Sequence, residues 1–179
     1  MHTSSLLHDG VIGLRALEPT DLDVLYQWEN DTTLWTVTDT VAPYSRQVLW
    51  QYLENYTADI YKSHELRLMA VMEDTGEPVG IVDLMNYSSL NNRAEMGLLI
   101  ASAHRGKGYG ERALALLLDY ARNHIGLRQL YAYVAADNAT CLHLLHEGGF
   151  STVGTLRQWR RRGVHYHDVV MLQRLLTDR

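Results

Sequence analysis

The 179-residue chain lacks several features that mark common protein classes. A single cysteine, Cys141, excludes an internal disulfide and agrees with a reducing compartment. No apolar run approaches the roughly 18 residues of a membrane-spanning helix, and residues 1–7 lack the basic and apolar regions of a signal peptide. A net charge of −5 argues against a general nucleic-acid binder, which is usually basic. We therefore expect a cytoplasmic protein with no membrane or nucleic-acid partner.

Length and composition are those of one globular unit. The chain is 46% hydrophobic and 21% charged, and it is too short for two ordinary domains. We predict a single domain over residues 1–179, with an ordered core of about residues 11–175. No internal repeat, linker or low-complexity tract interrupts it. A homo-oligomer is compatible with the sequence, which does not determine the oligomeric state.

Charge is distributed unevenly along the chain. Residues 16–61 hold eight acidic residues and only Arg46 as a base, so this part carries −7 and the remainder +2. A solvated helical face explains this distribution, and so does a field that attracts a cationic substrate. The sequence leaves both interpretations open.

Residues 94–110, AEMGLLIASAHRGKGYG, contain the most informative pattern. An alternating apolar run predicts a strand, and a turn with three glycines then leads into a long helix. Glycine lets the backbone approach a ligand closely, and the amides at a helix N-terminus bind anions. The stretch reads as an anion site, although on its own it is equally consistent with a tight turn.

Known phosphate-binding loops do not all fit this turn. An ATP-type loop needs Gly-Lys-Ser/Thr, but Lys107 is followed by Gly108, and a nucleotide hydrolase is therefore disfavoured. Glycines 106, 108 and 110 also miss the spacing of the dinucleotide fingerprint. The pattern Arg/Gln-x-x-Gly-x-Gly/Ala remains, and Arg105, Gly108 and Gly110 satisfy it.

Periodicity and turn residues predict the order β-α-α-β-β-β-α-β-α-β-β. Residues 30–44 read as a loop, residues 45–60 as one amphipathic helix capped by Ser45, and residues 159–167 as the connection within a final antiparallel pair. The expected strands are residues 12–17, 66–72, 79–85, 94–100, 130–135, 150–158 and 168–172, and the expected helices begin near residues 20, 45, 109 and 138.

With these motifs in place, the chain resembles the GNAT superfamily of acetyl-CoA-dependent N-acetyltransferases over nearly its whole length. Its sequence blocks are most similar to the spermidine/diamine and ribosomal-protein N-terminal subgroups, for example Gly80–Leu84, Asn92–Glu95 and Gly149-Phe150. The resemblance implies an α/β (α+β) fold with a central mixed, mostly antiparallel sheet of about seven strands, flanked by about four helices. It also implies acetyl-CoA as co-substrate, with no metal.

The resemblance assigns donor-binding roles to the strand, the loop and a later asparagine. Backbone amides of the strand would hold the pantetheine arm, and the glycine loop would hold the pyrophosphate. Leu98 is equally consistent with a plain core position, and Asn138 can also cap its own helix. The candidate acetyl-CoA residues are Met96, Leu98, Ile100, Arg105, Gly106, Lys107, Gly108, Tyr109, Gly110 and Asn138.

Acetyl transfer to an amine requires removal of a proton, because an alkyl ammonium with a pKa of about 10.4 is only about 0.1% neutral near pH 7.4. Glu95, on the alternate face of the central strand, is the first candidate base, and Asp83 is the second. The family's usual tyrosine acid is replaced by Leu145. Cys141 stands one helical turn earlier and could donate a proton, although a small buried hydrophobe would fit there equally well.

The acceptor site in this family lies between the first inter-helix loop and the last hairpin. A small or polyamine-like primary amine is our preferred acceptor, attacked directly in a ternary complex, and a peptide N-terminus is second. The alternative is a non-catalytic acyl-CoA-binding module. The histidines lack the ligand count and spacing of a recognised metal site. The run Arg160–Arg162 is consistent with a solvated hairpin tip or with an anion contact. The candidate acceptor residues are Glu29, Asp31, Trp35, Tyr44 and Asp83.

Overall fold

Seven strands form one mixed sheet in the computed structural model, which describes residues 6–176. Their order in the sheet is β1-β2-β3-β4-β5-β7-β6, with β4 and β5 parallel and every other neighbouring pair antiparallel. This arrangement confirms the predicted fold class. The strands are β1 (Ile12–Ala16), β2 (Leu66–Met72), β3 (Pro78–Ser88), β4 (Arg93–Ile100), β5 (Gln129–Ala135), β6 (Ser151–Arg162) and β7 (His165–Leu175).

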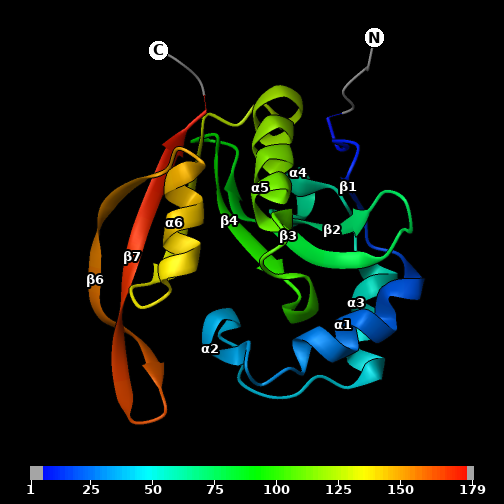
Figure 1. Ribbon diagram of the computed structural model, residues 1–179, viewed down its shortest axis with the longest axis horizontal. Helices are drawn as coiled ribbons and strands as arrows, with labels where there is room; N and C mark the ends of the chain where they lie inside the picture. Colours follow the sequence, from blue (N-terminus) through cyan, green and yellow to red (C-terminus); the bar gives the residue numbers. More distant parts are fainter. Residues whose placement is uncertain (1–5, 177–179) are drawn as a thin grey trace.

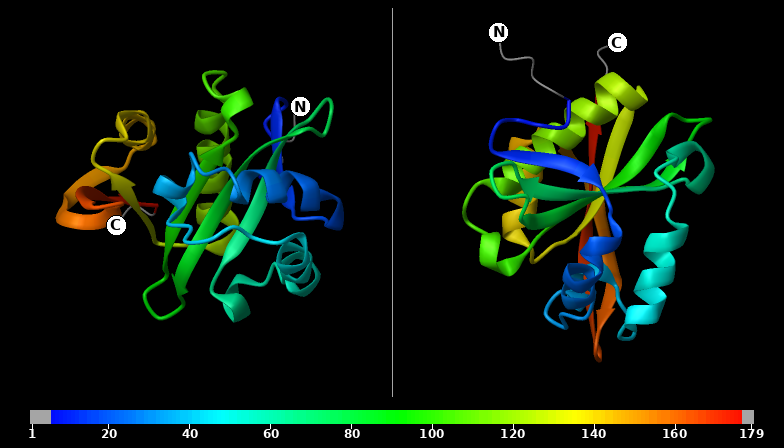
Figure 2. Two further views of the ribbon diagram at one scale, coloured as in Figure 1. Left: turned by 90° about the horizontal axis from the view of Figure 1, so that it is seen from below. Right: turned by 90° about the vertical axis from the view of Figure 1, so that its right-hand side faces the viewer.

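Helices cover the two faces of this sheet unequally. Helices α5 and α6 lie side by side on one face, and both begin at the end where β4 finishes (Figure 1). Helices α1 and α3 lie on the opposite side of the sheet from α5 (Figure 2). Within the described residues no helix is long and apolar enough to cross a membrane. The helices are α1 (Leu22–Glu29), α2 (Trp35–Thr38), α3 (Arg46–Asn55), α4 (Ile60–Ser63), α5 (Tyr109–Tyr120) and α6 (Ala139–Glu147).

Two apolar clusters hold these layers together. The larger one joins the sheet to the inner side of α5, where Leu114 and Leu117 are almost completely buried. The smaller one packs Leu25 of α1 against Met69 and Ile81 on the other face. Burial of each such side chain contributes about 1.5–3 kcal/mol. The central strands are therefore fixed from both sides, which gives the functional groups on β4 a rigid support.

Several predicted boundaries in the acceptor half are wrong. Residues 30–44 contain the single-turn helix α2, and the predicted helix over residues 45–60 is two helices. Helix α3, with Ser45 as its confirmed cap, ends at Asn55, and Asp59 then caps α4. Apolar residues continue at helical spacing across this break, so periodicity alone did not detect it.

The last hairpin is longer than predicted. Strand β6 continues to Arg162 and β7 begins at His165, so residues 159–167 are mostly strand. A bulge between Leu156 and Arg160 explains the error, because Gln158 has a left-handed φ of 51° and its amide donates to Asp168 Oδ1 at 2.8 Å. Bulges disturb the two-residue alternation from which strands are recognised. The hairpin therefore reaches past the sheet toward α2 (Figure 1).

Candidate active site

Strands β4 and β5 separate partway along their length. They pair in parallel only from Arg93–Gln129 to Glu95–Tyr131, whereas β4 stays paired with β3 as far as Ile100. Beyond Glu95 the β5 side of β4 is therefore open. The opening runs along the strand whose amides, by the resemblance, would hold a pantetheine arm.

Backbone groups of β4 point into this opening. The amide of Ala101 donates to the carbonyl of Val79 at 3.0 Å, so position 101 is turned toward β3. Because antiparallel pairing alternates along a strand, the amides of Met96, Leu98 and Ile100 are turned away from β3. The side chains of Met96 and Leu98 pack toward the core beneath α5, and those of Leu98 and Ile100 are half-buried.

A loop of unusual backbone conformation links β4 to α5. Gly106 and Gly108 have φ of +73° and +80°, and no atom lies within 4 Å of a Cβ built on either. A side chain at either position would fill this open space and strain the backbone. Gly108 is the N-cap of α5, so the first amides of a 12-residue helix face the same space. The sequence-predicted anion site is therefore a geometrically open one, and it fits the diphosphate of CoA.

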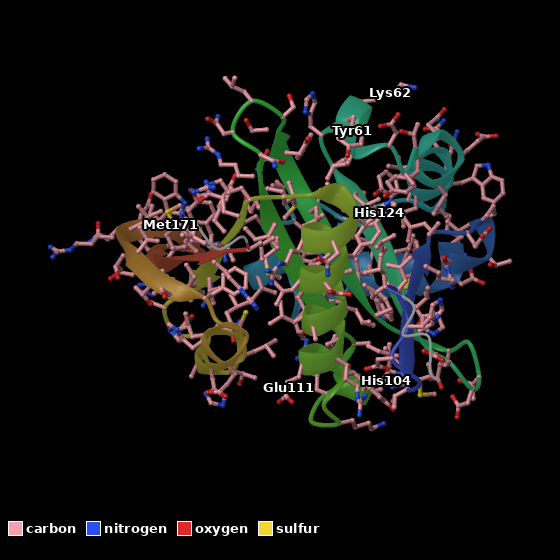
Figure 3. The ribbon with its side chains drawn as sticks, turned by 90° about the horizontal axis from the view of Figure 1, so that it is seen from above. Tyr61, Lys62, His104, Glu111, His124 and Met171 are labelled. Carbon is pink, nitrogen blue, oxygen red and sulfur yellow. The ribbon has the colours of Figure 1, made fainter. Side chains whose placement is uncertain are left out.

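Residues around this helix start are tied to neighbouring elements. His104 Nε2 lies 3.2 Å from Glu77 Oε1 in the β2–β3 turn, and His104 and Glu111 flank the start of α5, with His124 at its far end (Figure 3). Tyr109 points inward and donates to Met72 Sδ at 3.3 Å. Of the predicted donor residues, Tyr109 therefore offers its amide and not its side chain.

Cationic groups of the loop remain accessible. Lys107 is exposed, and exposed Arg105 donates through Nε to the carbonyl of Ile100 at 3.0 Å. Hydrogen bonds from Thr33 lower the pKa of Asp31, and the charge of Arg105 lowers it further. Asp31, predicted on the acceptor side, thus lies near the donor loop. The segment that contains Asp31 and the loop that contains Arg105 are therefore close to each other across the opening.

Glu95 stands where β4 and β5 separate. Its Oε2 accepts from Asn86 Nδ2 at 2.9 Å, and within residues 6–176 no cation is ion-paired with it. It shares the α1/α3 face with Gly97, where a Cβ would lie 3.3 Å from both Asp83 Cβ and Met85 Cε. The side chains of Asp83 and Met85 therefore occupy the space above Gly97, and a larger residue there would displace them.

Arg67 of β2 organises the carboxylates nearby and was missed by sequence reasoning. Its Nε donates to Asp83 Oδ1 at 2.7 Å and its Nη1 to Glu29 Oε1 at 3.0 Å. Burial opposes the charged form, but Asp83 and then Glu29 raise the pKa of Arg67 above its usual value. Tyr52 lies beneath the guanidinium, and burial raises its pKa to about 12. A lone cation inside the apolar run LRLMAVM was the available sign.

This cluster changes what two predicted residues can do. Asp83 and Glu29 are both ion-paired with Arg67. Neither carboxylate is therefore free to act as a base or to bind an ammonium group. A depression of about 130 Å³ lies beside the cluster, lined in part by Tyr52, Arg67 and Asp83. The cluster supports the acceptor face structurally, and Glu95 is the carboxylate left available on it.

The segment 30–44 closes the acceptor side through contacts with distant elements. Arg160 of β6 makes a two-point ion pair with Asp39, with Nε–Oδ1 at 2.8 Å and Nη2–Oδ2 at 3.0 Å. Trp35 donates from its indole to the carbonyl of Glu29 at 2.8 Å, and the backbone of Tyr44 exchanges two hydrogen bonds with the side-chain amide of Asn30. The inter-helix loop and the last hairpin, between which the resemblance places the acceptor site, are thus in contact through Asp39 and Arg160.

Helix α6 begins at Asn138 on the other side of the opening. Asn138 Oδ1 accepts from the amide of Cys141 at 3.1 Å, which confirms its cap role and leaves its NH₂ group as a donor. Burial raises the pKa of the half-buried Cys141 thiol, which therefore stays protonated. Leu145 is 1% exposed and belongs to the core. Within the described residues, no group of His, Cys, Asp or Glu could hold a metal ion.

An open β4–β5 junction beside an amide-rich helix start defines a transferase that binds an acyl thioester of CoA. Comparison with known proteins places the chain more narrowly: the family model described as "Acetyltransferase (GNAT) domain" matches residues 12–151. The protein belongs to the GNAT acetyltransferase family. It is an N-acetyltransferase that uses acetyl-CoA as co-substrate.

Relatives with known activities resemble the chain over most of its length. Spermidine N(1)-acetyltransferase of Escherichia coli (strain K12) is 31% identical over 148 residues, which cover 81% of this chain and 75% of that protein. A crystal structure of the Vibrio cholerae spermidine N-acetyltransferase with CoA and spermine is 27% identical, with a TM-score of 0.84, and covers 94% of this chain and 97% of that one. A dodecameric structure of the same enzyme has a TM-score of 0.78, 27% identity, and coverage of 94% and 95%.

Proposed function

We propose that this N-acetyltransferase acts on a primary amine of a small polyamine-like molecule, and that the amine attacks the thioester directly in a ternary complex. One observation carries this proposal: Glu95, which has no ion-paired cation among residues 6–176, stands where β4 and β5 separate and faces the acceptor side. The similarity to two spermidine acetyltransferases supports the choice of acceptor. An acidic segment, −7 over residues 16–61, would attract a polycation to this side.

Glu95 would take one proton from the incoming ammonium, directly or through a water molecule. This step is needed because about 0.1% of an alkyl amine is neutral near pH 7.4. Acetyl-CoA, when bound, supplies an acetyl group already activated as a thioester. Amides of Met96 and Leu98 point into the gap and would stabilise negative charge on the acetyl oxygen.

Departure of the thiolate needs little help. A thiol has a pKa of about 8.5, so the thiolate leaves tolerably near neutral pH. Cys141 stays protonated because burial raises its pKa, and it would return a proton to the departing sulfur. We assign it this role as an auxiliary donor. Leu145, buried in the core at the family's tyrosine position, takes no part.

The donor side would bind CoA mainly through backbone. Amides at the start of α5 would hold the diphosphate, with Arg105 and Lys107 adding positive charge. Asn138 would donate its NH₂ group to the pantetheine arm. We propose that the single acetyltransferase domain assembles as a homo-oligomer, as the Vibrio cholerae relative does.

Release of free CoA thiol tests the activity. Acetyl-CoA is incubated with spermidine, spermine, diamines, amino acids and peptide N-termini, and thiol is measured with a chromogenic disulfide. We expect acceptor-dependent thiol with polyamines first. Tight CoA binding by calorimetry without acceptor-dependent thiol from any amine would instead identify a non-catalytic acyl-CoA-binding module.

A further inference from the structure

Strand β5 carries two tyrosines on the same face as Glu95. Tyr131 is the direct partner of Glu95 in the last parallel pair, and Tyr133 is two residues further, beside the opening. Their ring centroids are 5.8 Å apart and their planes are inclined by 80°. Two rings at nearly right angles and a carboxylate thus meet at the point where the strands part.

The electrostatic character of this corner is mainly negative, although the charge of Arg93 on β4 also acts on Tyr131. Burial raises the pKa of Tyr131, and the charge of Glu95 raises it further, so the phenol stays neutral. Glu95 has no ion-paired cation within the described residues, whereas Glu29 and Asp83 share Arg67. A carboxylate and the negative faces of two aromatic rings both attract cations.

The β7 side chains that pair with the two tyrosines are uncharged. Met171, the β7 partner of Tyr133, lies on the outer strands away from α5 (Figure 3). Gln173, the partner of Tyr131, is hydrogen-bonded to Gln129. Neutral neighbours on β7 do not screen a cation held by the rings.

We propose that Tyr131, Tyr133 and Glu95 form the binding site for the protonated primary amine of the acceptor. The rings hold the ammonium over their faces, and Glu95 then accepts its proton. Tyr131 and Tyr133 are accordingly specificity-determining residues that select a cationic alkyl amine. This inference rests on the proposed function and adds the groups that recognise the acceptor before transfer.

Two replacements at each tyrosine distinguish the contribution of the aromatic ring to amine binding from that of the hydroxyl. Tyr133→Leu and Tyr131→Leu remove the aromatic face, and we expect each to raise the KM for the amine about tenfold. Tyr133→Phe and Tyr131→Phe keep the face, and we expect KM to stay near the wild-type value. Tyr120→Leu on α5 is the matched control. Binding of CoA, measured by calorimetry, is expected to be unchanged in all five variants.

A charge comparison tests the site without turnover. Choline and 3,3-dimethylbutan-1-ol have the same shape, but only choline is a cation. We expect choline to bind the CoA-loaded protein about tenfold more tightly, with the preference lost in Tyr133→Leu. Equal binding of the two probes would overturn the inference, as would Phe variants as impaired as the Leu variants. If no amine is acetylated but choline still binds selectively, the proposed reaction fails and the ammonium site stands.

Discussion

The loop before α5 and the segment before α3 border the same opening, but different forces hold them in place. The loop over residues 101–110 is shaped by its own backbone, with His104 donating to Ala101 and two glycines at positive φ. The segment over residues 30–44 is held by side chains from distant strands, since Asp39 pairs with Arg160, 121 positions away. Donor binding is thus encoded locally, and acceptor binding depends on tertiary contacts.

This difference has a functional consequence. All acyl-CoA enzymes of one class bind the same donor, and backbone amides suffice because the diphosphate carries no variable feature. Acceptors differ, so the surrounding ion pairs and rings determine which amine fits. Substitutions in the donor loop should change binding of CoA alone, and those across the opening should change amine binding or stability.

Glu95→Gln gives the largest expected effect and tests the point where the two sides meet. Glutamine keeps the shape and can still accept from Asn86, but it cannot take a proton. We expect kcat to fall about 100-fold or more, with CoA binding unchanged by calorimetry. A variant with the full rate across the pH range would refute Glu95 as the base.

Arg67→Met tests whether the acceptor face depends on a buried ion cluster. The change leaves Glu29 and Asp83 partly buried without a cation, and we expect the free energy of unfolding in urea to fall by about 3 kcal/mol. Arg46→Met, which breaks the exposed pair with Asp23, is the control and should lower the free energy of unfolding far less. Equal losses in the two variants would contradict the structural role of Arg67.

Gly108→Val tests the donor side alone. A β-branched residue at φ +80° costs about 1–2 kcal/mol and disturbs the amides at the start of α5. We expect KM for acetyl-CoA to rise about tenfold, with KM for the amine near wild type. Gly126→Val carries similar strain at φ +76° beyond the far end of α5. If Gly126→Val raised KM for acetyl-CoA equally, general destabilisation would explain both results.

Cys141→Ala gives the smallest expected effect and tests the auxiliary proton donor. A thiolate with a pKa of about 8.5 leaves without assistance, so we expect kcat to change less than about threefold. Because burial raises the pKa of Cys141, its alkylation by iodoacetamide should be slower than that of a free thiol at the same pH. A loss comparable to that of Glu95→Gln would make Cys141 the principal acid.

The sequence predicted the donor side because its determinants are consecutive. Periodicity located β4, and the glycines of residues 106–110 marked positive φ at Gly106 and Gly108, as the structure has them. Gly110 differs, since its φ is not positive and a Cβ there would make only an ordinary contact with Leu144 at 3.5 Å. Backbone requirements of this kind can be recognised from a single amino-acid sequence.

The acceptor side could not be predicted in the same way. Helix α2 is a single turn within a Thr- and Asp-rich stretch, and helices so short are stabilised by tertiary contacts rather than by propensity. The pairing of Arg67 with both Glu29 and Asp83 joins three elements, which no local pattern records. The sequence shows that Tyr131 and Tyr133 lie on one face of their strand. Only the pairing register of that strand reveals that Tyr131 is beside Glu95.

A crystal structure with a bisubstrate analogue, in which the CoA sulfur is joined through an acetyl unit to spermidine, tests the central claim most directly. The account predicts that the acetyl unit lies between β4 and β5 beyond the Glu95–Tyr131 pair, with the amine nitrogen within hydrogen-bond or one-water reach of Glu95. A pantetheine arm outside this opening, or an amine on the α5/α6 side of the sheet, would contradict it.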